Sequence, residues 1–192
     1  EGHEENYLTP ENHIPDHYDP RPWESCITMA GGWSYNPDAH YKPARQLIHS
    51  LVDIVSKGGN LLLNIGPGPD GTWQDEAYER LEEIGIWMKV NGAAIYGTEG
   101  REQFKEGKLS FTVSKDGSIN AIYLAGENEK RPPSEILIRD VKSSDKTQIN
   151  MLGHGKLEWE KASGGLKFFI PDDVRNNPPC KYAWSFNISE VH

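Results

Sequence analysis

The residues best suited to chemistry form a short acidic and aromatic group in the first part of the chain. Glu24 follows Trp23 directly, and a second aromatic pair, Trp33 and Tyr35, comes shortly after. Aromatic neighbours can exclude water from a carboxyl and keep it protonated near neutral pH, as a general acid for a leaving oxygen requires. Aromatic rings also offer an apolar surface to a sugar. The same residues are compatible with a solvated surface glutamate and ordinary loop aromatics, so only a wider pattern decides.

A glycine-rich loop suggests a second chemistry, the binding of a dinucleotide. Residues 66–71 read Gly-Pro-Gly-Pro-Asp-Gly and match the G-x-G-x-x-G pattern between an expected strand and an expected helix. Pro67 and Pro69 have no backbone N–H, which removes two donors from a loop that would have to hold a pyrophosphate. No second strand ending in a ribose-binding acid follows at short range. We interpret the loop as a tight structural connection rather than an oxidoreductase site.

Metal and thiol chemistry have little support in the sequence. His13 and His17 are four residues apart, but Pro15 between them excludes a shared helical face. Cys26 and Cys180 stand far apart and in no metal or redox spacing. The sequence therefore predicts no metal site and no cofactor.

Composition excludes two classes of partner. The 192 residues carry 20 basic and 29 acidic side chains, a net charge of −9, which repels phosphate backbones and anionic lipids. No apolar run is long enough to cross a bilayer. We therefore expect neither nucleic acid nor a membrane as partner. The chain opens at Glu1 without an initiator Met or a leader, and we expect it to be a fragment or a processed product.

The first half has the pattern of an α/β protein. Apolar residues in 43–57 recur at helical spacing, with a proline in the first turn and Gly58-Gly59 as the stop. Residues 60–65 form an uninterrupted apolar run, which predicts a strand covered on both faces. A second amphipathic helix ends near Gly92, and Thr72 with Asp75 suggests a capping box at its start. Helix, buried strand and helix in this order favour an α/β fold.

After about residue 98 the apolar period changes to two. Alternating residues on either side of a turn at 115–118 predict a hairpin, and further alternation occurs in 166–170 and 182–188. Strands without helices favour an antiparallel β-sandwich, so we place one domain at 1–98 and an all-β domain at 99–192. A (β/α)8 barrel needs about 250 residues, so the first domain can hold only part of one.

Several motifs together resemble a known family. In chain order they are Trp-Glu-Ser-Cys at 23–26, Trp-Ser-Tyr at 33–35, Gly-Gly-Asn-Leu-Leu-Leu-Asn-Ile-Gly-Pro at 58–67, Asp-Gly at 70–71 and Asn-Gly-Ala-Ala-Ile-Tyr-Gly-Thr at 91–98. Over about residues 5–98 the chain resembles the α-L-fucosidases of glycoside hydrolase family 29. The resemblance implies the last βα units of a (β/α)8-type barrel followed by a β-sandwich.

The resemblance also implies a function. The family members are retaining enzymes that release terminal α-linked L-fucose from glycans, with two carboxyls about 5 to 5.5 Å apart. By resemblance Glu24 is the general acid/base and Trp33 lines the fucose pocket, whereas the Asp nucleophile belongs to a segment before Glu1. The substrate would be a fucosylated glycan, and the rest of the barrel a necessary partner, so this chain alone should be inactive. The location would be secreted, periplasmic or lysosomal.

The chain differs from the family motifs at two positions, and two other functions remain as alternatives. Ala93 replaces a Glu that many members have, and Ser34 replaces the middle Gly of a Trp-Gly-Tyr motif. The first rival function is a non-catalytic module that binds carbohydrate or a protein partner. The second is the dinucleotide-dependent oxidoreductase, which the two loop prolines argue against.

Overall fold

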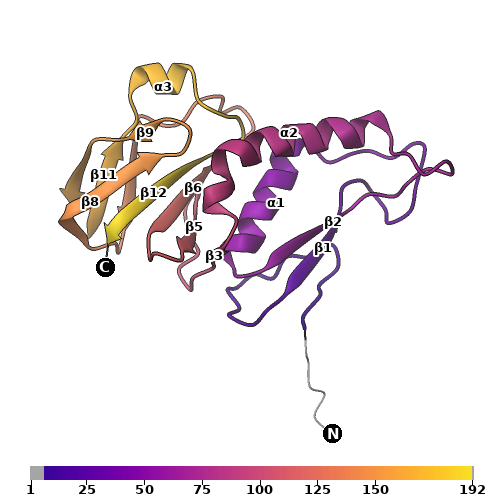
Figure 1. Cartoon of the computed structure of the whole chain (residues 1–192), viewed down its shortest axis with the longest axis horizontal. Coiled ribbons are helices and arrows are strands. Elements are labelled where there is room, and N and C mark those ends of the chain that lie inside the picture. Colours follow the sequence, from indigo (N-terminus) through magenta and orange to yellow (C-terminus); the bar gives the residue numbers. More distant parts are fainter. Residues whose placement is uncertain (1–6, 192) are drawn as a thin grey trace, which may run out of the picture.

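The computed structural model describes residues 7–191, and the ends of both predicted domains, residues 1–6 and 192, lie outside this range. The first half contains a two-stranded parallel sheet and two long helices (Figure 1). Its elements are β1 (Glu24–Thr28), α1 (Ala44–Ser56), β2 (Asn60–Asn64), α2 (Asp75–Asn91) and the short 3-10 helix η1 (Gly92–Ala94). The predicted helices and the predicted strand are confirmed, whereas β1 was not predicted.

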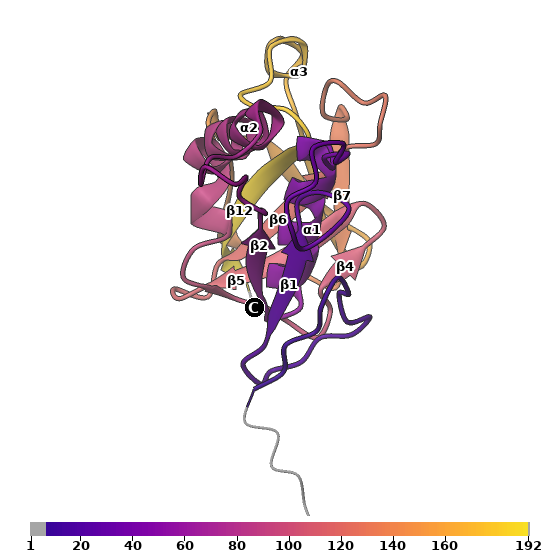
Figure 2. The same ribbon diagram turned by 90° about the vertical axis from the view of Figure 1, so that its right-hand side faces the viewer.

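Helix α1 lies between the two parts of the molecule and buries side chains on two sides. Ile54 packs with Trp23 and Ile27 of the β1 region, whereas Ile48 and Val52 belong to the large core shared with the β-rich half. Figures 1 and 2 show the helix between the β1–β2 pair and the large sheet. The sequence predicted one apolar face, and Ile54, outside that face, gives the helix its second packing partner.

The strand β2 differs from its prediction in one respect. It pairs in parallel with β1, with Glu24 opposite Asn60 and Thr28 opposite Asn64. Side chains alternate between the faces of a strand, and only one face of β2 is packed, because Leu62 on the other face is 49% exposed. Within the described residues β2 is therefore covered on one face, and a cover for its second face stays a prediction.

The start of α2 also differs from its prediction. The residue that caps the helix is Gln74, and it makes no side-chain cap hydrogen bond. The hydroxyl of Thr72 donates instead to Asp70 at 2.8 Å, within the preceding turn. The predicted capping box is therefore wrong, because Thr72 stabilises the loop and not the helix.

The second half consists of two antiparallel sheets. The larger has seven strands, in the order β3-β5-β6-β12-β8-β9 with β4 added to β5, and the smaller has the order β10-β11-β7. Their bounds are β3 Thr98–Glu99, β4 Lys105–Glu106, β5 Leu109–Ser114, β6 Ile119–Leu124, β7 Glu135–Arg139, β8 Ser143–Met151, β9 Gly155–Lys156, β10 Trp159–Ala162, β11 Gly165–Phe169 and β12 Ala183–Val191, with helix α3 at Asp172–Asn176.

The predicted hairpin is β5–β6, and its turn is closed by Ser114, whose amide donates to the Ser118 carbonyl at 2.9 Å.

The two sheets face each other through one core, in which the ring centroids of Phe168 and Phe186 lie 4.9 Å apart. The same core contains Trp87 of α2, whose indole donates to the Ala183 carbonyl at 2.9 Å. The two halves of the chain are therefore packed against each other.

Candidate active site

The candidate site lies where β1 and β2 end, because the loops that follow both strands meet there. Parallel strands direct their carboxyl ends to one edge, which is where α/β proteins bind ligands. The amide of Met29 donates to the Asn64 carbonyl at 2.9 Å and so joins the two strand ends. Lys42 holds the loop after β1, since its ammonium donates to the carbonyls of Thr28 and Ala30. Burial lowers the pKa of Lys42.

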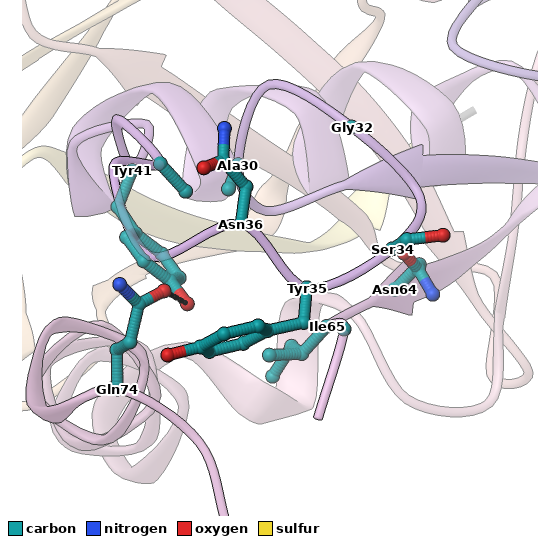
Figure 3. Close-up of a pocket in the computed structure, with 11 residues that line it drawn as sticks. Ala30, Gly32, Ser34, Tyr35, Asn36, Tyr41, Asn64, Ile65 and Gln74 are labelled. Atoms are coloured by element: carbon teal, nitrogen blue, oxygen red, sulfur yellow. Dashed lines mark hydrogen bonds between the residues drawn. The ribbon is translucent and has the colours of Figure 1, made fainter. Parts of the chain in front are cut away.

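A hollow at this edge is lined by side chains from both loops (Figure 3). Tyr41 donates to the side-chain oxygen of Gln74 at 3.0 Å, and the Gln74 amide donates in turn to the Pro37 carbonyl. The ring of Tyr35 extends across the hollow toward Gln74. The side-chain oxygen of Asn64 is buried and has no hydrogen-bond partner among the described residues. A buried acceptor of this kind favours a donor group at the site.

Gly66 explains why the two loops can approach so closely. A Cβ atom at this position would lie 2.5 Å from the Tyr35 amide nitrogen and 2.6 Å from the Ser34 carbonyl carbon, both in the backbone. Only glycine fits there without moving the loop that carries Trp33. The Gly-Pro of the long motif therefore positions the aromatic loop.

Trp33 and Tyr35 are 40% and 39% exposed, so both rings offer apolar surface at the carboxyl edge of the strands. Tyr35 lines the hollow, whereas Trp33 is not among its lining residues. Exposed rings of this kind suit a neutral sugar, which has apolar C–H faces and hydroxyl edges. The predicted role of Trp33 in a fucose pocket stays a prediction.

Glu24 lies elsewhere, at the opposite end of β1. It is the first residue of the strand, and four residues at about 3.3 Å each place it about 13 Å from the carboxyl edge. The structure therefore does not bring Glu24 and Trp33 together. Trp23 does not desolvate Glu24 either, because its buried ring packs on the opposite face, against Gly59 and the α1 side.

Glu24 and Cys26 lie on the same face of β1. A second glutamate, Glu11, lies beside Cys26 on the neighbouring segment. The segment before β1 runs parallel to it, with bridges that place Leu8 beside Trp23 and Glu11 beside Cys26. Burial raises the pKa of the Cys26 thiol, and the negative charges of Glu11 and Glu24 raise it further, so both carboxylates lie near this thiol.

Glu11 was missed by the sequence prediction. It lies two residues, or about 7 Å, nearer the carboxyl edge than Glu24. The chain around it makes only isolated bridges and contains Pro10, so no strand pattern identifies it. The alignment with β1 is visible only in the structure.

The backbone amides of the glycine-rich loop donate to acceptors within the loop itself. Gly68 donates to the Thr72 carbonyl at 2.7 Å, Gly71 donates to the Gly68 carbonyl at 2.9 Å, and the Thr72 amide donates to Asp70. These donors are unavailable to a pyrophosphate, in agreement with the structural interpretation of the loop.

The remaining candidates from the sequence do not form a site in the structure. No group of three or more His, Cys, Asp or Glu side chains suited to a metal occurs within the described residues. Cys26 and Cys180 are both free thiols. In residues 7–191, neither long helix has the length and apolarity needed to cross a membrane.

Comparisons with known proteins match nearly the whole chain. Residues 1–93 match the model of the family described as α-L-fucosidase, and residues 105–189 match the α-L-fucosidase C-terminal domain. The plasma α-L-fucosidase of Homo sapiens is 33% identical over 199 residues, which are 96% of this chain and 41% of the relative. The α-L-fucosidase of Branchiostoma floridae is 34% identical over 88% of this chain and 38% of its own length.

Solved structures agree with the sequence matches. The α-L-fucosidase isoenzyme 1 of Paenibacillus thiaminolyticus superposes with a TM-score of 0.81 at 25% identity, over 97% of this chain and 45% of that one. The α-fucosidase of Thermotoga maritima in complex with a mechanism-based inhibitor gives 0.78 at 29% identity, over 96% and 42%. The chain thus spans less than half the length of these relatives. It belongs to the α-L-fucosidase family and corresponds to the C-terminal portion of that family's proteins.

Proposed function

We propose that the complete protein containing this chain is a retaining α-L-fucosidase that hydrolyses terminal α-linked L-fucose from glycans. In this proposal, residues 1–98 are the last βα units of a (β/α)8-type barrel and residues 99–192 are a β-sandwich. The remaining barrel strands and the Asp nucleophile come from polypeptide outside these residues. The observation that carries the proposal is the α-L-fucosidase sequence of the chain, with the exposed rings of Trp33 and Tyr35 after the carboxyl end of β1.

Fucose suits the exposed aromatic rings of this edge chemically. It is neutral and has a methyl group at C6, which favours an apolar wall such as the exposed ring of Trp33. The acidic balance of the chain, with a net charge of −9, disfavours an anionic substrate.

The general acid/base must protonate the leaving oxygen and then deprotonate the attacking water. The Trp-Glu motif assigns this role to Glu24. The position along the strand favours Glu11 instead, because barrel enzymes place catalytic groups at the carboxyl ends of their strands. Both carboxylates lie near Cys26, on the face of β1 opposite α1, which in this proposal is the interior of the barrel.

Kinetics of three variants of the complete protein test these assignments. An aryl α-L-fucoside with a poor leaving group requires protonation, and loss of the acid should slow its hydrolysis by about 100-fold or more. Fucosyl fluoride needs little protonation, so its kcat/KM, which reports formation of the fucosyl-enzyme, should fall much less. Glu24→Gln and Glu11→Gln are compared with Glu82→Gln, which changes the exposed side of α2. The glutamate whose change slows the aryl fucoside selectively is the acid/base, and wild-type protein without any turnover would contradict the proposed activity.

The rival function, a non-catalytic carbohydrate-binding module, is disfavoured by the distribution of exposed aromatics. All exposed large apolar side chains of the described residues lie at or before Tyr96, and none lies in residues 99–189. The aromatic side chains that reach the surface of the antiparallel sheets, Tyr123, Trp159 and Phe169, are only partly exposed. Turnover of a fucoside by the complete protein separates the two functions directly.

The relatives called plasma and tissue α-L-fucosidase suggest where the protein works. We infer a secreted or lysosomal location, with the periplasm as the bacterial equivalent. Fractionation of the source cells, with the complete protein detected by antibody, tests this location.

A further inference from the structure

The segment that carries Glu11 is held against β1 by a short ladder of hydrogen bonds. The Cys26 amide donates to the Pro10 carbonyl at 3.0 Å, and the Asn12 amide donates to the Cys26 carbonyl at 2.8 Å. Glu11 lies between these two bonds, beside Cys26. Because Pro10 has no backbone N–H, the segment has few donors of its own with which to hold Glu11 in place.

The side chain of Asn12 continues this ladder to the carboxyl end of β1. Its Oδ1 atom accepts from the Thr28 amide at 3.0 Å and from the Thr28 hydroxyl at 3.1 Å. Asn12 has φ +48°, a left-handed conformation that asparagine tolerates better than most residues. The two bonds from Thr28 hold Asn12 in this conformation, directly after Glu11.

Lys42 holds the other side of Thr28. Its ammonium donates to the Thr28 carbonyl, to the Thr28 hydroxyl oxygen at 3.2 Å and to the Ala30 carbonyl at 3.3 Å. Thr28 is 2% exposed, and its hydroxyl has a single proton to donate. An ammonium is a donor without an acceptor, so Lys42 occupies a lone pair of the hydroxyl and leaves its proton for Asn12. Lys42 therefore orients the bond that holds Asn12.

We propose that Thr28 and Lys42 are positioning residues, which hold Glu11 where the general acid/base acts. This inference rests on the proposed fucosidase function, and it gives the acid/base role to Glu11 rather than to Glu24, which lies at the opposite end of β1 from Thr28. A general acid must lie within hydrogen-bond reach of the leaving oxygen, so a displacement of about 1 Å can slow the reaction by up to about 100-fold. The bonds from Lys42 through Thr28 to the residue after Glu11 restrict such a displacement.

The test uses the complete protein and two substrates that differ in their need for protonation. Thr28→Val removes the hydroxyl with little change in shape, and Lys42→Met removes the ammonium. Each should lower kcat/KM about tenfold for an aryl α-L-fucoside with a poor leaving group, and less than about twofold for fucosyl fluoride. Thr28→Ser keeps the hydroxyl and should recover most of the rate. Lys156→Met changes an exposed lysine of β9 and should alter neither substrate.

A double variant tests whether the two residues act through one chain of bonds. If Lys42 acts through the Thr28 hydroxyl, Thr28→Val combined with Lys42→Met should lose no more on the aryl fucoside than the larger of the two single losses. Losses that multiply would contradict the chain. If Thr28→Val does not fold, the comparison of Lys42→Met with Lys42→Arg, which keeps a cationic donor, decides in its place.

The remaining outcomes are equally decisive. Equal loss on both substrates would mean that the changes disturb fucose binding or the fold, and unchanged kinetics would mean that Glu11 needs no such support, so either result overturns the inference. Selective loss for Glu24→Gln without one for Glu11→Gln would overturn it as well. Failure of the proposed function looks different, because the wild-type protein would then hydrolyse neither substrate.

Discussion

At the scale of single residues, the two glycines that open the long motif have separate physical roles. Gly58 has φ +90°, a left-handed conformation that suits glycine, and ends α1. A Cβ atom on Gly59 would lie 2.4 Å from the buried Trp23 ring. Gly59→Ala should therefore lower the free energy of unfolding of the complete protein by about 1–3 kcal/mol, measured by urea denaturation. Gly31→Ala is the control, because open space surrounds Gly31, and an equal loss there would refute the packing argument.

His49 is a second residue with a testable role. It lies half-buried on α1, with Nε2 2.9 Å from the Tyr182 carbonyl oxygen. Burial lowers the pKa of His49, the bond to Tyr182 opposes this, and the charge of Arg45 adds to the lowering. The unfolded chain then binds the proton more readily, so His49 reduces stability as pH falls below about 6.5.

The variant His49→Gln keeps a donor toward Tyr182 but cannot titrate. We expect its Tm to fall less than that of the wild type between pH 7.5 and pH 5.5, with similar values at pH 7.5. An identical fall in both proteins would show that other groups cause the pH dependence.

At the scale of elements, a chain of buried polar side chains joins η1 to the centre of the large sheet. Thr112 of β5 donates to the Ala94 carbonyl at 2.8 Å and accepts from Asn120 of β6 at 3.2 Å. Asn187 of β12 donates to Asn120 and to Ser118, both at 2.9 Å. These bonds tie the middle of β12 to β6 and to the turn before it.

Removal of the Thr112 hydroxyl should lower the free energy of unfolding, because it breaks two hydrogen bonds of this network. Thr112→Val leaves a buried carbonyl and a buried amide without their partner, so we expect a loss of about 1–3 kcal/mol in the free energy of unfolding. Ser163→Ala, at an exposed turn, should change it by less than about 0.5 kcal/mol. A loss below that value for Thr112→Val would mean that water replaces the hydroxyl.

The helices and strands differ in how well the sequence predicted them. Helices α1 and α2, strand β2 and the β5–β6 hairpin were predicted because each has a local apolar period or a turn signal. Strand β1 is five residues of mixed polarity, and β8 is largely polar, so both depend on partners distant in sequence. The position of Glu24 relative to Trp33 depends on where β1 starts and ends, which no local pattern fixes. For this reason Glu11 also escaped detection.

At the scale of the whole molecule, one exposed leucine tests whether the chain is part of a closed barrel. Leu62 of β2 points away from α1, on the face that carries Glu24 and Cys26, and is 49% exposed in these residues alone. If further barrel strands close around this face, Leu62 becomes interior. Leu62→Ala in the complete protein should then cost about 2–5 kcal/mol in the free energy of unfolding, as for a buried leucine.

An open sheet predicts a different result for the same change. A half-exposed leucine without further partners loses little packing, and Leu62→Ala would then cost less than about 1 kcal/mol. Urea denaturation of the complete protein distinguishes the two values. Glu82→Gln, on the exposed side of α2, provides the baseline for a surface change. A small loss for Leu62→Ala would contradict the barrel, and with it the placement of Glu11 and Glu24 in a closed interior, while leaving the family membership unaffected.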